Sequence, residues 1–475
     1  MKKDYILPNL DNARKRDKEV SETLIFNIDE KYKDLGLNKK YYVITHGCQA
    51  NVRDSETISG ILEALGYTSC EELKDADVII VNTCAVRKGA EDKVLGQLGD
   101  LKKFKTSNPD LIIGMGGCMC QEESTVQTII EKYRQVDIVF GTHNITSLPH
   151  LLYDVYTSRK RKIEVYSKMG EIVENVPATR FMSHKAWVNI MYGCNNFCTY
   201  CIVPYTRGKE RSRNAKDIID ECKELVKQGY KEICLLGQNV NSYGKDLNNN
   251  YGFGDLLNDV ASTGINRLRF VTSNPWNFDD SIIEAFKKHD NIMPYIHLPI
   301  QSGNTGILKK MNRKYTREEY LALYDKLKAN IPGCAFTTDI IVGFPNESDE
   351  AFEDTLSAVE HCEYDNAFTF IYSKRDGTPA ASMEDVIPRE VKEERLQRLN
   401  EKVAYYANKN NQKFKDKTVE VLVDGLSKRN SNVYSGYTRE NKLVNFTGED
   451  IQIGDLVMVK ITEVMSFSLN GIQVK

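Results

Sequence analysis

The sequence has no uninterrupted apolar run long enough to span a bilayer, so we expect no membrane-spanning helix. Its first twenty residues are polar and charged and contain no apolar segment typical of a signal peptide, so we expect a cytoplasmic protein. It has no low-complexity tract, and its formal net charge is only −3 at pH 7. Bulk charge therefore gives no indication of a nucleic-acid partner.

The chain does contain twelve cysteines among its 475 residues. Structural disulfides are disfavoured in a reducing compartment, so clustered cysteines there indicate metal binding or catalysis.

The length predicts about three domains, and the pattern along the chain predicts an α/β protein. Residues 1–39 mix charges of both signs and are expected to form a flexible arm. Residues 40–167 alternate short apolar runs with helical stretches, which predicts an open parallel βα domain. Residues 180–411 repeat this alternation with six strand candidates and end in a helical connector, which favours a partial (β/α)6 barrel over an open doubly wound sheet. Residues 412–475 contain five short β segments, typical of a small antiparallel β-barrel.

Three cysteines lie in the short motif CNNFCTYC, directly after the first strand of the expected barrel. These residues are Cys194, Cys198 and Cys201. Thiolates suit zinc or iron–sulfur clusters, and both a structural zinc ion and a cubane cluster normally take four protein ligands. Three cysteines leave one coordination position open, as a catalytic metal requires. The alternative is a zinc site with a distant fourth ligand.

Three more cysteines each follow a separate strand candidate. We call Cys48, Cys84 and Cys118 the amino-terminal cysteines. Since the carboxyl ends of parallel strands meet at one edge of a sheet, these thiols are expected to converge there. Cys120 lies close enough to compete with Cys118 as a ligand. The alternative is that these are ordinary buried cysteines.

The motif CNNFCTYC resembles the C-x3-C-x2-C loop of the radical S-adenosylmethionine (SAM) enzymes. The segments THGCQANVRDSE, NTCAVRKGAE and GGCM precede it in the order found in the methylthiotransferase branch of that family, and the last domain resembles TRAM, an RNA-binding β-barrel. The resemblance covers about residues 40–475. It implies a radical-SAM barrel and two 4Fe-4S clusters. One cluster would lie on Cys194, Cys198 and Cys201, which we call the radical cysteines, and the other on the amino-terminal cysteines. SAM would serve as methyl donor and as the source of a 5′-deoxyadenosyl radical.

Further SAM contacts are expected near the loop and at later strand ends. These candidates are Tyr200, Gln238, Asn239, Gln301, Ser302, Asp339 and Gly343. The segment LLGQNVNSYG lies where the family has its glycine-rich cofactor segment but lacks a glutamate, so Gln238 or Asn239 would bind the amino group of SAM. The alternative is that these are turn residues that close barrel units.

Two groups of basic residues are candidates for RNA contact. Arg207, Lys209, Arg211 and Arg213 lie within seven residues of one another, and arginines beside a catalytic site suit phosphate backbones. A solvated charged loop is the alternative. The last domain has 9 Lys/Arg against 8 Asp/Glu, so its bulk charge does not favour RNA. A local basic face next to Tyr434 and Tyr437 could still bind RNA. Its basic residues would be Lys428, Arg429, Arg439 and Lys442.

The segment PYTRGKERSR is similar to that of the MiaB type, the tRNA 2-methylthio-isopentenyladenosine synthases. This implies a tRNA carrying isopentenyl-adenosine next to the anticodon as substrate, with a methylthio group added at carbon 2 of the adenine. Carbon 2 carries an unactivated C–H bond, so a radical step is needed. Proximity then requires both clusters to face a common pocket.

Other substrates remain open at this point. Sister enzymes act on threonylcarbamoyl-adenosine in tRNA or on an aspartate of a ribosomal protein. An alternative of another class is a zinc-stabilised RNA-binding protein without catalysis. For the enzyme we expect an electron donor such as flavodoxin or ferredoxin, no membrane partner, and a monomer.

Overall fold

The computed structural model describes residues 5–14, 22–85, 88–167, 171–247, 249–428 and 430–474, apart from the side chains of residues 88–90. The chain folds as two compact units. Unit 1 contains Met1–Phe181, Met191–Asn195 and Cys201–Arg213, and unit 2 contains Met182–Ile190, Asn196–Tyr200 and Asn214–Lys475. The division therefore falls inside the segment that carries the radical cysteines.

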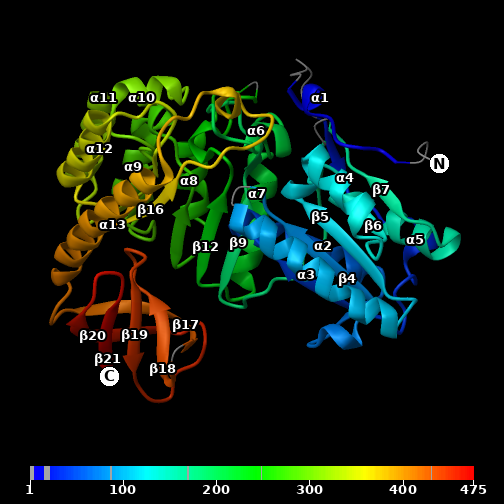
Figure 1. Ribbon diagram of the computed structural model, residues 1–475. Coiled ribbons are helices and arrows are strands. Elements are labelled where there is room, and N and C mark those ends of the chain that lie inside the picture. Colours follow the sequence, from blue (N-terminus) through cyan, green and yellow to red (C-terminus); the bar gives the residue numbers. More distant parts are fainter. Residues whose placement is uncertain are drawn as a thin grey trace. The chain divides into compact units, whose positions relative to one another are not determined.

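Unit 1 is built on a six-stranded sheet in which neighbouring strands run parallel, as the alternating pattern predicts (Figure 1). In sheet order the strands are β3 (Thr68–Ser69), β2 (Lys40–Thr45), β4 (Val78–Thr83), β5 (Ile112–Gly117), β6 (Ile138–Phe140) and β7 (Lys162–Glu164). The central strands β4 and β5 are buried along their whole length. This explains their continuous apolar runs, because a parallel strand covered on both faces has no solvent side.

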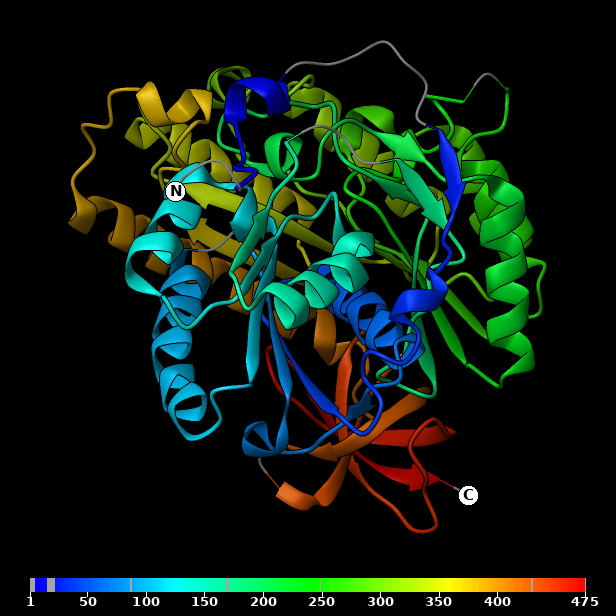
Figure 2. The ribbon, with the colours of Figure 1, turned by 90° about the vertical axis from the view of Figure 1, so that its right-hand side faces the viewer.

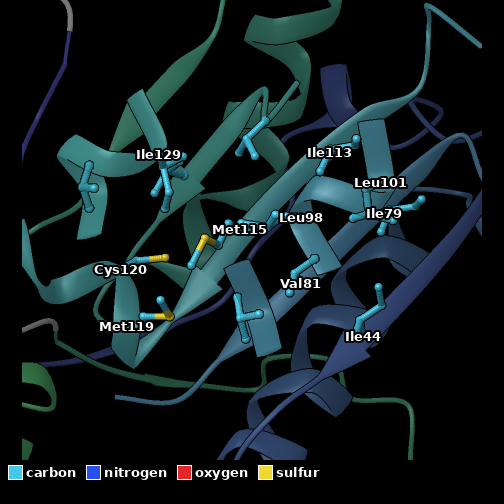
Figure 3. Packing of buried hydrophobic residues seen from close by; sticks show 14 of the residues in the cluster. Ile44, Ile79, Val81, Leu98, Leu101, Ile113, Met115, Met119, Cys120 and Ile129 are labelled. Carbon is cyan, nitrogen blue, oxygen red and sulfur yellow. The ribbon is translucent and has the colours of Figure 1, made fainter. Parts of the chain in front are cut away.

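Helices cover both faces of this sheet. Helices α2 (Gln49–Ala64) and α5 (Leu148–Ser158) pack on the face that includes Ile80. Helices α3 (Lys88–Ser107) and α4 (Glu123–Lys132) pack on the opposite face, where Ile79, Val81, Ile113 and Met115 meet Leu98, Leu101 and Ile129 (Figure 3). Neighbouring residues of β4 thus enter different cores, as the two-residue period of a strand requires.

The predicted arm is partly ordered in the described residues. Strand β1 (Thr23–Ile25) pairs in parallel with β8 (Ile172–Glu174), and the short helix α1 (Leu10–Arg14) precedes it. The partner of β1 lies far along the chain, so periodicity within residues 1–39 gives no indication of this pairing.

Unit 2 contains six parallel strands in two three-stranded sheets. The first sheet holds β9 (Lys185–Asn189), β12 (Glu232–Leu236) and β13 (Arg267–Phe270), and the second holds β14 (Tyr295–His297), β15 (Ala335–Val342) and β16 (Asn366–Ile371). A parallel bridge between Leu268 and Ile292 links the two sheets. Since the strands follow chain order without the reversal of a doubly wound sheet, the partial barrel is the observed architecture.

Helices of unit 2 alternate with these strands. They are α7 (Ala215–Lys227), α8 (Phe253–Ala261), α9 (Asp280–Lys288), α10 (Thr305–Lys310), α11 (Arg317–Asn330) and α12 (Asp349–Cys362). Helix α11 begins with a capping box, in which the Thr316 side chain accepts from the Glu319 backbone and the Glu319 side chain accepts from the Thr316 backbone. The long connector is α13 (Arg389–Gln412), which packs on α12 and β16. Within the described residues, no helix is both long and apolar enough to cross a membrane.

The chain ends in a closed five-stranded barrel, drawn orange to red in Figure 2. Its strands are β17 (Thr418–Ser427), β18 (Asn430–Tyr437), β19 (Leu443–Thr447), β20 (Leu456–Val464) and β21 (Leu469–Val474). All its pairings are antiparallel except that of β19 with β21, which is parallel. Small apolar side chains such as Val421, Val444 and Val459 fill its interior.

Candidate metal centres

The three amino-terminal cysteines lie at one edge of the unit 1 sheet. Cys48 directly precedes α2, Cys84 directly follows β4, and Cys118 directly follows β5. Strands β2, β4 and β5 are neighbours and parallel, so their carboxyl ends bring these residues together. The Cys48 and Cys84 side chains share a hydrogen bond. The predicted convergence of separate strand ends is therefore present in the fold.

The structure also separates Cys118 from its competitor Cys120. The Cys120 side chain belongs to the apolar core between the sheet and helices α3 and α4, near Met115 and Ile129 (Figure 3). Burial there raises the pKa of the Cys120 thiol. The Cys118 sulfur instead accepts a hydrogen bond from Arg207 Nε at 3.2 Å. This geometry favours Cys118 as the ligand.

Buried polar side chains stabilise this edge of the sheet through hydrogen bonds. Asn51 Nδ2 donates to the Thr83 carbonyl at 2.9 Å, and Asn82 Nδ2 donates to the Asn51 carbonyl and to Ser55 Oγ, both at 2.8 Å. Thr83 Oγ1 donates to the Gly116 carbonyl at 2.7 Å. These buried hydrogen bonds tie the ends of β4 and β5 to α2 and so fix the spacing of the cysteines. These residues stand inside the cysteine motifs, but their types alone do not distinguish them from ordinary helix and strand residues, so the sequence did not predict this role.

A buried ion pair completes the edge. Arg207 is 7% exposed, and its Nη2 lies 2.6 Å from Asp54 Oδ2. Burial alone would lower the pKa of Arg207, but Asp54 and Cys118 outweigh it and hold that pKa well above its usual range. The hydrogen bond from Cys84 and, to a lesser extent, the charge of Arg207 lower the pKa of Cys48 to about 5 against the effect of burial. One thiol of the set is thus prepared as a thiolate, the form that binds metals.

We tested this donor set against the cluster that it is expected to hold. In the described part of the chain, no three His, Cys, Asp or Glu side chains are arranged to hold a single ion. A cubane cluster binds each cysteine on a separate iron, so its ligands need not converge on one point. Three thiols on one edge, one of them acidic and one held by a guanidinium, fit such a cluster chemically.

The segment of the radical cysteines is held at both ends of its turn. In unit 1, the Cys194 backbone N–H donates to the Gly208 carbonyl at 3.0 Å, and Tyr192 pairs with Arg211 in a short hairpin, β10 (Met191–Tyr192) with β11 (Arg211–Ser212). In unit 2, the Thr199 N–H donates to the Met311 carbonyl at 3.0 Å. These bonds fix the backbone around the three thiols.

A second arginine contacts this segment. Arg313 Nη1 donates to Cys198 Sγ at 3.4 Å, and Arg313 Nη2 donates to the Pro299 carbonyl at 3.1 Å. The guanidinium also lies 4.9 Å from the centre of the Trp276 ring and 5.1 Å from that of Tyr315. Burial opposes its charge, but Tyr315, Tyr200 and Cys198 raise the pKa of Arg313 well above its usual range. Sequence reasoning missed Arg313, because nothing near it in the sequence links it to Cys198.

The predicted SAM contacts lie in unit 2, at the carboxyl side of the barrel strands or near Cys198. Gln238 and Asn239 follow β12, Gln301 and Ser302 follow β14, Asp339 lies on β15, and Gly343 directly follows β15. Gln301 has φ +68°, and its N–H donates to the Asp339 carbonyl at 2.9 Å. Tyr200 packs edge-on against Phe344, with ring centres 6.5 Å apart. This is the edge where parallel α/β folds bind ligands, and the role of each residue stays a prediction.

The basic residues after the radical cysteines are mostly buried. Arg207 pairs with Asp54, and Arg213 lies 2.6 Å from Glu174. Arg211 is also buried, stacks on Tyr192 and donates to the Arg207 carbonyl at 3.4 Å. These three side chains hold unit 1 together instead of presenting charge to a phosphate backbone. Lys209 is partly exposed, and its RNA contact stays a prediction.

The last barrel shows a similar departure from the predicted basic face. Lys442 is buried and its Nζ lies 2.6 Å from Asp365 Oδ1, while Arg439 donates to the Asp290 carbonyl. Both residues anchor the last barrel to the partial barrel within unit 2. Lys428 is exposed, as the RNA prediction requires, and Arg429 lies outside the described residues.

A six-stranded partial barrel with a three-cysteine segment after its first strand defines the class of radical SAM enzymes. Profiles of known families agree with this class. The radical SAM superfamily matches residues 188–359, the uncharacterized protein family UPF0004 matches residues 40–141, and the TRAM domain matches residues 412–474. Among solved structures, the radical SAM methyltransferase TsrM from Kitasatospora setae has a similar fold, with a TM-score of 0.53 at 12% identity over 72% of this chain and 75% of that one.

Relatives with high sequence identity identify the family within the class of radical SAM enzymes. The tRNA-2-methylthio-N(6)-dimethylallyladenosine synthase of Staphylococcus saprophyticus is 54% identical over 98% of this chain and 91% of its own. The proteins of the same name from Geobacillus thermodenitrificans and Bacillus cytotoxicus are 55% and 56% identical, again over 98% of this chain and over 90% and 92% of their own. This chain belongs to the tRNA-2-methylthio-N(6)-dimethylallyladenosine synthase family. Its radical SAM domain implies one 4Fe-4S cluster and SAM.

Proposed function

We propose that this chain adds a methylthio group to carbon 2 of N6-dimethylallyl-adenosine (isopentenyl-adenosine) in tRNA, with SAM as methyl donor and radical source. The observation that carries the proposal is identity above one half along nearly the whole chain to synthases named for this product. Both cysteine sets that the chemistry needs are present. The amino-terminal cysteines lie at strand ends of unit 1, and the radical cysteines follow β10 in the segment that the division between the units crosses.

We propose further that the amino-terminal cysteines hold a second 4Fe-4S cluster. When bound, the cluster on the radical cysteines supplies the electron that splits SAM, and the second cluster carries the sulfur to be methylated. Within unit 1, the covalent chain limits the distance between Cys201 and the amino-terminal cysteines. Arg207 contacts Cys118 and lies only six residues after Cys201, so at full extension those six residues span about 20 Å at most. The helix α6 (Val203–Thr206) between them shortens this reach.

The remaining parts of the proposal concern partners. The electron donor would be a flavodoxin or ferredoxin, and the protein would act as a monomer in the cytoplasm. The partly exposed Lys209 and the exposed Lys428 are the remaining basic candidates for contact with tRNA. Threonylcarbamoyl-adenosine tRNA and the ribosomal-protein aspartate serve as comparison substrates. The names of the relatives favour dimethylallyl-adenosine over both.

The first experiment measures iron and acid-labile sulfide per chain after anaerobic reconstitution. Two cubane clusters give about eight of each, and Cys118→Ala should reduce this to about four. Cys120→Ala is the matched control, because its side chain lies in the apolar core, and it should keep both clusters. Four irons in the wild-type chain would refute the second cluster, and zinc without sulfide would refute the enzyme.

The second experiment tests the reaction. Wild-type chain, reductant and SAM should convert dimethylallyl-adenosine tRNA to a product heavier by one methylthio group in place of hydrogen, as read by mass spectrometry of digested tRNA. Cys198→Ala should abolish cleavage of SAM to 5′-deoxyadenosine. Conversion of either comparison substrate in place of this tRNA would overturn the substrate assignment.

A further inference from the structure

Each cysteine set has one ligand sulfur that accepts a hydrogen bond from an arginine. In unit 1, Arg207 Nε lies 3.2 Å from Cys118 Sγ, and in unit 2, Arg313 Nη1 lies 3.4 Å from Cys198 Sγ. The two arginines come from unrelated places in the fold. Arg207 directly follows α6, and Arg313 follows α10. The same contact therefore occurs twice in one chain on different scaffolds.

The two guanidinium groups differ in how their charge is balanced. Arg207 forms a buried ion pair with Asp54, and its Nη2 lies 2.6 Å from Asp54 Oδ2. Arg313 instead lies against the faces of Trp276 and Tyr315 and donates to the Pro299 carbonyl. Across the described ranges, no ion pair between Arg313 and a carboxylate is present. The nearest anionic group expected beside Arg313 is thus the cluster ligand itself.

This difference has a redox consequence. The potential of an iron–sulfur cluster depends on net charge and on hydrogen bonds to its sulfurs, and groups around the ligands orient and tune them. A neighbouring cation stabilises the reduced cluster, because reduction adds negative charge. A cation paired with a carboxylate acts only as a dipole, whose effect is weaker than that of an unbalanced charge.

We propose that Arg313 and Arg207 are positioning residues that each hold one cysteine ligand and raise the reduction potential of the adjacent cluster, Arg313 more strongly than Arg207. The Arg207 part rests on the proposed second cluster. Arg313 thereby makes the cluster that reduces SAM easier to reduce by a physiological electron donor. The Arg207–Asp54 pair leaves the reduction potential of the second cluster closer to its intrinsic value.

The test compares Arg313→Gln and Arg207→Gln, which keep an N–H donor and lose the charge, with Arg313→Lys and Arg207→Lys, which keep the charge. Arg317→Gln is the matched control, since Arg317 pairs with Asp354 on α12. Each reconstituted full-length variant is titrated with reductant, and the reduced clusters are followed by electron paramagnetic resonance. Added SAM should alter only the signal of the cluster on the radical cysteines. This response shows which midpoint belongs to which cluster.

We expect Arg313→Gln to disfavour reduction of the SAM-sensitive cluster at least tenfold, a shift of about 59 mV for a one-electron couple. Arg207→Gln should shift the other midpoint less, the lysine variants should recover most of each shift, and Arg317→Gln should shift neither. Unchanged midpoints in the glutamine variants at full iron content would overturn the proposal. So would loss of iron in both the glutamine and lysine variants, which would assign the arginines to folding alone. If the wild-type chain bound only four irons, both the second cluster and the proposed role of Arg207 would be refuted. The reduction midpoint of Arg313→Gln would still test the proposed role of Arg313.

Discussion

At the scale of the residue, glycines in the left-handed region position the cysteine ligands. Gly47, Gly117 and Gly193 directly precede Cys48, Cys118 and Cys194, with φ of +129°, +99° and +74°. A Cβ on Gly117 would lie 2.4 Å from the Thr83 carbonyl oxygen, and one on Gly193 would lie 1.9 Å from that of Lys209. Only glycine combines this backbone conformation with such close approach. The chain can therefore turn sharply at a strand end and still present a thiol at the edge.

Gly117→Ala should therefore damage the amino-terminal site. The left-handed conformation alone costs a residue with a Cβ about 1–2 kcal/mol, and the overlap with Thr83 adds to this. We expect a lower free energy of unfolding and about half the iron of the wild-type chain, measured by denaturant titration and iron analysis. Gly99→Ala in α3 is the control, because nothing lies within 4 Å of its added Cβ, and it should stabilise the chain by about 0.5–1 kcal/mol. Full iron content in Gly117→Ala would show that the turn tolerates a side chain.

Cys48 provides a pH-dependent prediction for the cluster-free chain. Its thiol has a pKa lowered to about 5 by Cys84 and Arg207, so it should be a thiolate through the neutral range. Its rate of alkylation by iodoacetamide should fall to half near pH 5 and stay nearly constant from pH 7 to 8, whereas an ordinary thiol with a pKa of roughly 8.5 gains reactivity over that interval. Mass spectrometry of the labelled peptide gives the rate. A steep rise between pH 7 and 8 would contradict the lowered pKa.

At the scale of the element, the sequence predicted strands and helices from the burial pattern of neighbouring residues. It did not predict contacts between residues that lie far apart in the chain. Continuous apolar runs predicted the parallel strands because both faces of β4 and β5 are covered, and strand ends predicted the edge that gathers the amino-terminal cysteines. The basic run after Cys201 predicted an exposed patch, yet Arg207 pairs with a residue 153 positions away. A charge run shows how many cations are present but not which carboxylates fold onto them.

The contact between the last barrel and the partial barrel belongs to this scale as well. Asp424 on β17 accepts from His184 Nε2 at 2.9 Å and lies 2.6 Å from Lys185 Nζ at the start of β9. Burial opposes the negative charge, but His184 and Lys185 hold the pKa of Asp424 below its ordinary value. A depressed carboxyl pKa contributes stability above its unfolded value of roughly 3.9 and loses it as pH falls through the folded value.

Asp424→Asn should therefore lower the free energy of unfolding by about 1–3 kcal/mol at pH 7, because it removes the negative charge beside buried Lys185 and leaves one amide oxygen to accept from both donors. The difference between variant and wild type should be constant from pH 6 to 8 and shrink only below about pH 4. Denaturant titrations at several pH values measure it. Asp450→Asn, on an exposed turn of the same barrel, is the control and should change little. A difference that vanishes already at pH 6 would assign the effect to another group.

At the scale of unit 2, the last barrel docks at the end of the partial barrel opposite to the carboxyl strand ends. Its anchor partners Lys185, Arg267 and Asp365 stand at or just before the starts of β9, β13 and β16. In folds of this kind the amino-terminal face serves stability and the carboxyl face serves chemistry. The eight residues of β15 alone span about 26 Å, so an RNA that contacts the last barrel must also extend along the side of the partial barrel to reach the radical cysteines.

Deleting residues 412–475 should consequently lower the stability of the remaining chain as well as its affinity for RNA. Arg267 is 0% exposed and donates to the Tyr437 carbonyl at 3.0 Å, so the deletion removes acceptors from a buried cation that Glu232 balances only in part. A hydrogen bond to a charged group contributes about 1.5–3 kcal/mol, so we expect a clear fall in the unfolding midpoint of the remaining chain. Since the carboxyl strand ends are untouched, the truncated chain should still cleave SAM at low temperature but no longer methylthiolate tRNA.

Lys428→Ala in the full-length chain separates the two effects, because it should weaken tRNA binding and leave the unfolding midpoint unchanged. An unaltered midpoint in the truncated chain would show that the last barrel is an appended module and not a structural support.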